Sequence, residues 1–299
     1  ESHYSVLMAA NVLGIGFDNV IKIPCDESGR MRIDKLQEEI ERTRTNGQTP
    51  FCVIATAGTT VRGAFDPIKE IAEICSGNDI WLHVDAAWGG SCMFSTKHRD
   101  LMDGVELADS VCWDAHKMMG VPLVCSAFLI KKPEILRKVC SHGDVAHYLF
   151  HGDSEDVDIG RISLQCGRRN DALKLFLAWR EKGDAGWARL VDSYVDLADH
   201  LQSLVEADEK LEMVSSRVWS NVCMRYVVEG FDLNDVNFQI RERMMREGRF
   251  MVSSSKVGDI VILRPVIANP AVTRDVLDSF VENAIQIGDD IVRGLPSTI

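Results

Sequence analysis

The first half of the chain alternates short runs of β-forming residues with helical periodicity, a rhythm that few folds accommodate. Residues 51–57 are predicted to form a buried strand that ends at Gly58. Asp66 is expected to cap the helix that follows, with Pro67 as its first residue. The apolar face of that helix repeats at helical spacing and comprises Ile68, Ile71, Ala72 and Cys75, and Gly77-Asn78 should end it.

Further strands are expected at 80–84, 110–113 and 124–130. Strand, helix and strand in this order predict βαβ units, and therefore an α/β fold with a mostly parallel sheet flanked by helices. In such sheets, ligands bind at the carboxyl ends of the strands. The residues that follow each strand are therefore the first candidates for a functional site.

The second half of the chain has a different pattern. Amphipathic helices are predicted at 171–182 and 190–205, and Thr273 is expected to cap a final helix. Strands are predicted between these helices at 221–228, 250–254 and 260–267, the last two joined by a turn around Val257-Gly-Asp259. We therefore expect a large domain at 1–183 and a smaller C-terminal α+β domain at 184–299.

The net charge excludes several kinds of partner. The sequence has 33 Lys and Arg against 45 Asp and Glu, a formal charge of −12. Nucleic acids and anionic membrane surfaces attract basic proteins, so neither is an expected partner. The longest run without Lys, Arg, Asp or Glu, 45–61, has 17 residues. A membrane-spanning helix needs about 20, so we expect none.

Cysteine usage and the first residues of the chain suggest where the protein resides and how much of it is present. The nine cysteines contain no C-x-x-C pair, which favours a reducing compartment and a cytoplasmic location. No spacing of His, Cys and acidic residues resembles a metal-ligand set. The chain starts at Glu1 without a Met or a leader peptide, and we expect it to be truncated at its N-terminus.

Charged groups follow two of the predicted strands. Asp85 lies at the end of one strand, and Lys117 follows the next strand in Asp114-Ala-His-Lys117. On adjacent βα units, these two side chains are expected to share one cleft. A buried Asp–Lys ion pair is one explanation. A pyridoxal phosphate site is the other, because a Lys holds the cofactor aldehyde as a Schiff base and an acid pairs with its pyridine nitrogen.

Longer motifs around these residues resemble the group II pyridoxal-phosphate decarboxylases. The motifs are Thr56-Ala-Gly-Thr-Thr-Val61, Gly63-Ala-Phe-Asp-Pro67, His83-Val-Asp-Ala-Ala-Trp-Gly-Gly90 and His116-Lys-Met-Met-Gly-Val-Pro-Leu123, extended by Gln165-Cys-Gly-Arg168 and Asn269-Pro-Ala-Val-Thr273. The glutamate and cysteine sulfinate decarboxylases are the nearest branch, since the aromatic amino acid enzymes usually have Tyr in place of Trp88. The resemblance implies a fold type I (PLP-dependent transferase-like) large domain.

The resemblance also implies roles around the cofactor. Lys117 would bind pyridoxal phosphate covalently, and Asp85 would bind its pyridine nitrogen. His3, in Ser2-His-Tyr-Ser5, would stack over the ring on the side of the substrate. Further cofactor contacts are implied for Thr60 and Ala87, beside the ring, and for His116, by the phosphate or the Schiff base.

Two further roles concern the substrate. Tyr148 falls on the family's mobile catalytic loop and would return a proton to Cα after carbon dioxide leaves. Arg264, in Leu263-Arg-Pro-Val266, matches the family's ligand for the substrate α-carboxylate, a task that suits a bidentate guanidinium. The resemblance further implies a homodimer with the active site near the interface.

Two departures from the family pattern stand out. Asp114-Ala115 replaces the usual Asn-Pro before His116, which adds a carboxylate beside the cofactor. The N-terminal stretch of the family, with dimer contacts, a phosphate-binding segment and substrate-selecting side chains, does not precede Glu1.

We therefore expect decarboxylation of an acidic L-amino acid, namely glutamate, aspartate or cysteine sulfinate, to the amine and carbon dioxide. A different reaction with the same cofactor, such as transamination or β-elimination, is the first alternative, because the same Lys and Asp would serve it. A truncated, non-catalytic homologue that binds a partner is the second.

Overall fold

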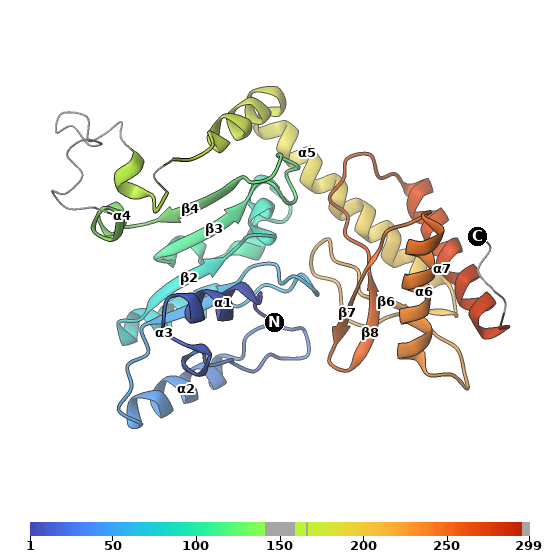
Figure 1. Cartoon of the computed structure of the whole chain (residues 1–299), viewed down its shortest axis with the longest axis horizontal. Coiled ribbons are helices and arrows are strands. Elements are labelled where there is room, and N and C mark those ends of the chain that lie inside the picture. The colour runs from blue at the N-terminus through green and yellow to red at the C-terminus, as the bar shows by residue number, and fades with distance from the viewer. Residues whose placement is uncertain (141–158, 166, 295–299) are drawn as a thin grey trace.

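The computed structural model describes residues 1–140, 159–165 and 167–294, arranged as two lobes. Helix α5 (Asp171–Ala207) runs from the larger lobe along the smaller one and connects them (Figure 1). Each lobe contains a four-stranded sheet. The fold is that of an α/β large domain with a smaller C-terminal α+β domain, as predicted.

The large sheet has the order β1-β2-β3-β4. Its strands are β1 (Cys52–Thr56), β2 (Trp81–Asp85), β3 (Ser110–Asp114) and β4 (Ser126–Ile130). The first three are parallel, and β4 runs antiparallel to β3, so the prediction of a mostly parallel sheet is confirmed. The register aligns Thr56, Asp85 and Cys112 across the first three strands, close to their carboxyl ends.

Helix α3 (Ile68–Asn78) packs on β1 and β2 and buries the four apolar residues predicted for its inner face. It ends at Asn78, as expected, because Asp79 adopts the left-handed conformation. The predicted cap is wrong: Pro67 is the N-cap residue, and no side chain caps the helix. The Asp66 carboxylate instead accepts hydrogen bonds from the backbone N–H groups of Met31 (2.6 Å) and Thr56 (2.7 Å).

Three helices of the large lobe were not predicted from the sequence: α1 (Ser5–Val12), α2 (Ile33–Thr45) and α4 (Pro133–Cys140). Within the described residues, five short 3₁₀ segments lie at Phe17–Asn19, Gly89–Phe94, Arg99–Met102, Val105–Leu107 and Ile159–Ile162. Helix α2 buries Leu36 and Ile40, four residues apart, and ion pairs such as Lys35–Glu38 line its exposed side.

The small lobe contains an antiparallel sheet of order β5-β6-β8-β7. Its strands are β5 (Leu211–Met213), β6 (Met224–Tyr226), β7 (Ser253–Val257) and β8 (Ile260–Arg264), and its helices are α6 (Leu233–Glu247) and α7 (Arg274–Val292). The Thr273 cap is confirmed, since its hydroxyl accepts from the backbone N–H of Val276 (3.4 Å). Strand β5 and helix α6 were not predicted.

Several segments differ from the prediction in their bounds: the strands expected at 221–228 and 260–267 are shorter, at Met224–Tyr226 and Ile260–Arg264. The strand expected at 250–254 lies at Ser253–Val257, because the hairpin turn at Gly258 (φ 60°) sets its pairing with β8. Phe250 packs edge-on against Phe280 instead of joining the sheet. The two helices expected on either side of residue 183 are one element, α5, in which Gly183 alone departs from helical geometry (φ 60°, ψ 175°). The domain boundary at residue 183 stays a prediction.

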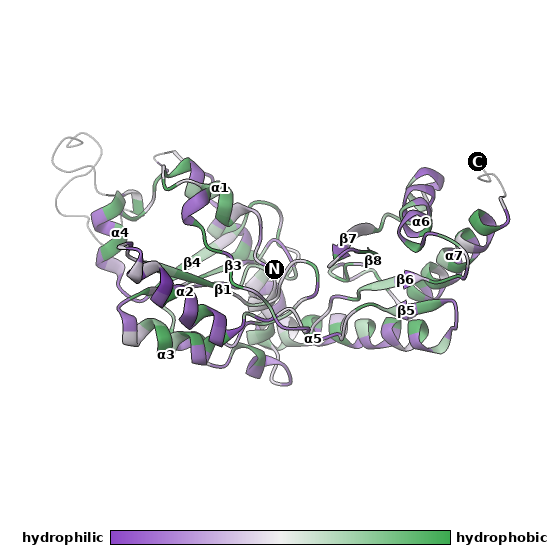
Figure 2. Cartoon of the chain, turned by 90° about the horizontal axis from the view of Figure 1, so that it is seen from below, coloured by the Kyte–Doolittle hydropathy of each residue, from purple (hydrophilic) through white to green (hydrophobic). Residues whose placement is uncertain are grey.

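One hydrophobic core extends through both lobes. Trp187, Tyr194 and Trp219 are completely buried in it, and α5 contributes the first two. Figure 2 shows green and purple residues mixed along α3, α5 and α7, as expected of helices with one buried face. In the ranges that the structure describes, no helix is long and apolar enough to cross a membrane.

Candidate active site

Two glycine turns bring the carboxyl ends of β1 and β2 into backbone contact. The N–H of Gly89 donates to the carbonyl oxygen of Ala57 at 3.0 Å. A Cβ on Gly89 would lie 2.4 Å from that oxygen, and one on Gly58 (φ +81°) would lie 2.6 Å from the Gly89 nitrogen. Only glycine fits either position, so these turns bring Thr60 and Asp85 to the same edge of the sheet.

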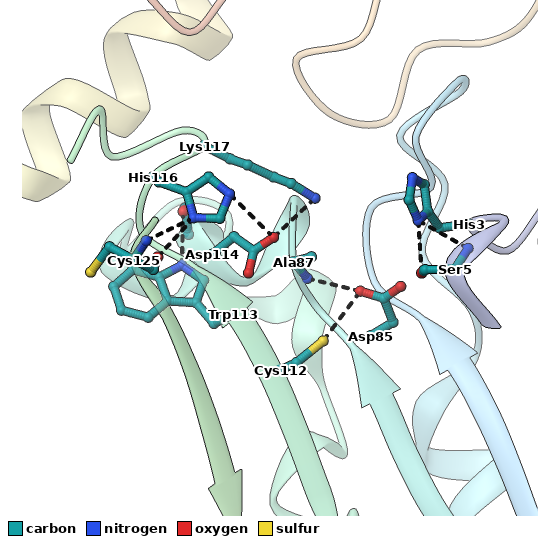
Figure 3. A network of polar contacts seen from close by, with 11 residues as sticks. His3, Ser5, Asp85, Ala87, Cys112, Trp113, Asp114, His116, Lys117 and Cys125 are labelled. Carbon is teal, nitrogen blue, oxygen red and sulfur yellow. Dashed lines mark hydrogen bonds and ion pairs between the residues drawn. The ribbon is translucent and has the colours of Figure 1, made fainter. Parts of the chain in front are cut away.

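Asp85 is the last residue of β2, and two donors hold one of its carboxylate oxygens. Oδ1 accepts from the backbone N–H of Ala87 at 3.1 Å and from the thiol of Cys112 at 3.4 Å (Figure 3). Within the described part of the chain, the second oxygen, Oδ2, has no hydrogen-bond partner. Asp85 therefore has one carboxylate oxygen left to bind a ligand.

Lys117 lies in the turn after β3. Its Nζ lies 3.2 Å from Asp114 Oδ2, and the same oxygen lies 3.8 Å from His116 Nε2. The other ring nitrogen of His116, Nδ1, lies 3.0 Å from the carbonyl oxygen and 3.2 Å from the amide nitrogen of Cys125. In Figure 3, Lys117 extends across the strand ends toward the side on which Asp85 and Ala87 lie. Lys117 therefore forms its ion pair with Asp114 and not with Asp85.

His3 lies across Asp85 from Lys117 (Figure 3). Its Nδ1 lies 2.8 Å from the hydroxyl oxygen of Ser5 and accepts from the Ser5 N–H at 3.3 Å, which fixes the ring. The ring centroid is 4.3 Å from that of Tyr4. Tyr148, the predicted proton donor, lies outside the described residues.

Arg264 reaches the large lobe from β8. Its guanidinium donates from Nη1 to the carbonyl oxygen of Thr60 (2.7 Å) and from Nη2 to the hydroxyl of Ser253 (3.2 Å). Its Nε is buried and has no hydrogen-bond partner among the described residues. Burial lowers the pKa of Arg264 from its ordinary value. The Thr60 side chain is exposed, and the contact uses only its carbonyl.

Comparison with known proteins identifies the family of this chain. Residues 1–227 match a family model described as the pyridoxal-dependent decarboxylase conserved domain. The chain belongs to the pyridoxal-dependent decarboxylase family. The cofactor of this family is pyridoxal phosphate.

Solved structures of this family resemble the chain closely. Mouse CSAD is 37% identical with a TM-score of 0.90, and the match covers 96% of this chain and 62% of that one. A Catharanthus roseus tryptophan decarboxylase is 26% identical (TM-score 0.89), covering 97% and 61%. An Oryza sativa TDC with PLP and tryptamine is 26% identical (TM-score 0.92), also covering 97% and 61%. The chain thus spans about three fifths of the length of these relatives.

The residues at the strand ends fit the cofactor of the family. A pyridine nitrogen needs a carboxylate oxygen that is not already paired, and Asp85 Oδ2 meets that need. The cofactor aldehyde needs a reachable amine, and the Lys117 side chain is 36% exposed. Asp85 ends β2, and Lys117 lies in the turn after the neighbouring strand, β3.

Some residues of the site were missed by the sequence analysis. The Asn221 amide is buried in the small lobe and accepts from Trp88 Nε1 (2.7 Å) while donating to the carbonyls of Thr60 (3.1 Å) and Val61 (3.0 Å). Cys112 had no predicted role. The position of Cys112 on the predicted strand next to that of Asp85 was the signal that could have identified it. Nothing in the sequence links Asn221 to Thr60 and Val61, which lie some 160 positions away.

His83, which has no predicted role, provides a test of the packing behind the site. Burial lowers its pKa from the ordinary value, and its Nδ1 lies 2.8 Å from the Ser110 hydroxyl, which accepts from Trp81 Nε1 (2.8 Å). The folded protein binds a proton on the His83 ring less tightly than the unfolded chain does. The stability that neutral His83 contributes is therefore lost as pH falls below the ordinary pKa of histidine.

The substitution His83→Asn should remove this pH dependence, since an amide oxygen can still accept from Ser110 but does not titrate. We expect the urea midpoint to fall more for the unchanged protein than for the variant between about pH 7.5 and about pH 5.5. Equal falls in the two proteins would show that His83 is not held neutral by the fold.

Proposed function

We propose that this chain forms the catalytic part of a pyridoxal-phosphate-dependent carboxy-lyase that converts an acidic L-amino acid to its amine and carbon dioxide. The observation that carries the proposal is the Asp85 oxygen that has no partner among the described residues, at the same sheet edge as the Lys117 amine. Family membership supports the reaction type, and the whole protein's activity is inferred from it because the chain is shorter than its relatives.

Each residue of the site has a proposed task. Lys117 holds the cofactor aldehyde, and Asp85 Oδ2 binds the ring nitrogen. When bound, pyridoxal phosphate supplies an electron-poor ring that accepts the electron pair released as the bond from Cα to the carboxylate breaks. Asp114 fixes the position of the Lys117 amine. His3 covers the ring on the substrate side.

The remaining contacts complete the site. Arg264 binds the substrate α-carboxylate, a role that the family resemblance supports and that suits a bidentate guanidinium. Tyr148 returns a proton to Cα. Thr60 and Ala87 would contact the ring, and His116 would contact the phosphate or the Lys117 linkage.

An acidic side chain is the proposed distinguishing feature of the substrate. Two facts support it: the motifs are nearest those of glutamate and cysteine sulfinate decarboxylases, and identity is higher to mouse CSAD than to the two plant proteins. Trp88, whose indole donates to Asn221, stands where the aromatic amino acid enzymes usually have Tyr.

The assay combines the protein and pyridoxal phosphate with glutamate, aspartate, cysteine sulfinate or, for comparison, tryptophan. We expect carbon dioxide and amine in equal amounts from at least one acidic substrate and none from tryptophan. A keto acid in place of the amine would indicate transamination. Tight cofactor binding without any product would indicate a non-catalytic homologue. Either outcome contradicts the proposal.

We further propose that the active assembly is a homodimer with the site near its interface, and that the protein works in a reducing compartment, the cytoplasm. The family resemblance supports the first point. The second is supported by the cysteines, since the eight that the structure describes are all free.

A further inference from the structure

The residue paired with Asp85 on the neighbouring strand is a cysteine. Asp85 of β2 and Cys112 of β3 are register partners, so both side chains lie on the same face of the sheet. The Cys112 thiol donates to Asp85 Oδ1 at 3.4 Å. Neither the family resemblance nor the proposed function gives Cys112 a role.

The protonation state of Cys112 suits this contact. Burial, the charge of Asp85 and the hydrogen bond to it raise the pKa of the thiol to about 12. At neutral pH, Cys112 therefore carries its proton and can donate it, weakly, to the carboxylate. A thiolate would repel the carboxylate instead.

The two donors to Oδ1 come from different elements. The Ala87 N–H belongs to the turn after β2, and the thiol belongs to β3. The backbone around them is fixed, because Ala86 N–H donates to the Cys112 carbonyl (3.0 Å) and Ala57 N–H to the Asp85 carbonyl (2.8 Å). The carboxylate is thus held at one oxygen from two sides.

We propose that Cys112 is a positioning residue, which turns the Asp85 carboxylate so that Oδ2 points to the ring nitrogen of pyridoxal phosphate. The inference rests on the proposed function, since it requires that this cofactor binds at Asp85. With a single backbone N–H as donor, the carboxylate could rotate about that hydrogen bond. A second donor from β3 prevents this rotation. Pre-orientation of this kind strengthens binding because less order is lost when the ligand arrives.

The test uses Cys112→Ala, which removes the donor, and Cys112→Ser, which keeps one. Cys52→Ala is the matched control, because Cys52 is also half-buried in the same sheet but lies in the first position of β1, at the opposite end of the strands from Asp85. The dissociation constant is measured by absorbance titration with pyridoxal phosphate and with its 1-deaza analogue, which has carbon in place of the ring nitrogen. Thermal unfolding of the cofactor-free proteins is measured alongside.

Cys112→Ala should bind pyridoxal phosphate about tenfold more weakly, the effect of one hydrogen bond to a charged group. Its affinity for the deaza analogue should stay within about twofold of the unchanged protein, because that ring makes no bond to Asp85. Cys112→Ser should bind pyridoxal phosphate within about threefold of the unchanged protein, and Cys52→Ala should be indistinguishable from it.

Two outcomes would overturn the inference while leaving the proposed function intact. Equal weakening for both compounds would mean that Cys112 supports the fold rather than the nitrogen contact. Unchanged affinity of Cys112→Ala for pyridoxal phosphate would mean that the thiol positions nothing. If the unchanged protein does not bind pyridoxal phosphate, the proposed function itself fails, and the role of Cys112 falls with it.

Discussion

Replacing Lys117 with arginine should abolish covalent attachment of the cofactor and lower amine production by more than about a thousandfold. Arginine keeps the positive charge beside Asp114, so the local ion pair and the fold should survive. A guanidinium does not lose its proton in proteins and cannot attack an aldehyde. The measurement is the visible absorbance of protein mixed with pyridoxal phosphate, followed by product analysis and thermal unfolding of the same preparation.

Lys35→Arg provides the matched control. Lys35 pairs with Glu38 three residues away, as Lys117 pairs with Asp114, and the two lysine side chains are similarly exposed, at 33% and 36%. Lys35 lies on α2 and has no role in the proposed reaction. Its substitution should leave absorbance and turnover unchanged. Amine production by the Lys117 variant at the rate of the control would refute the assignment of Lys117.

Replacing Gly89 with alanine should destabilise the protein by about 3 kcal/mol. The new Cβ would lie 2.4 Å from the carbonyl oxygen of Ala57 and 2.7 Å from Cζ of Phe65, and the first contact is with backbone that cannot rotate away. Relief requires the turns after β1 and β2 to separate, which breaks the hydrogen bond from the Gly89 N–H to Ala57. Chemical unfolding of the cofactor-free protein measures the loss.

The control for this prediction is Gly77→Ala. Gly77 lies in α3, and a Cβ there meets nothing within 4 Å, so alanine should stabilise the protein by about 0.5 kcal/mol through its better helix propensity. A Gly89 variant as stable as the Gly77 variant would show that the two turns are not in the close contact described.

The large sheet could be predicted because its signals are local. The strand expected at 51–57 contains β1 (Cys52–Thr56), and the inner face of α3 is set by residues that repeat within two turns of helix. Asp66 was assigned wrongly as a cap because its second partner, Met31, lies 35 residues away and belongs to a segment with no recognisable pattern. Burial raises the pKa of Asp66, as expected for a carboxyl group enclosed between a strand and a loop.

The small lobe was harder to predict for a different reason. Its sheet is formed by strands as short as three residues, such as β6, and short strands leave almost no alternation to detect. Helix α6 has a clear N-cap in Asp232, which accepts from the N–H groups of Asn234 and Asp235, but its buried face includes polar residues such as Asn237 and Arg243. A search for apolar periodicity therefore does not detect α6.

The candidate site was predictable in part. Asp85 and Lys117 could be placed at one sheet edge because parallel strands end together. Two other contacts of the site could not be predicted. The hydrogen bond from Cys112 to Asp85 depends on strand register, and the one from Asn221 to the Thr60 carbonyl depends on the packing of the two lobes. Asp114 was noted as a departure from the family, and its contact with Lys117 was visible only in the structure.

The central claim is that Lys117 forms the covalent link to pyridoxal phosphate. The most direct measurement reduces the protein–cofactor mixture with borohydride, digests it, and locates the phosphopyridoxyl group by mass spectrometry. We predict the label on the peptide that contains Lys117, with Lys35 and the other lysines unlabelled. Label confined to another lysine, or absent while absorbance shows bound cofactor, would contradict it.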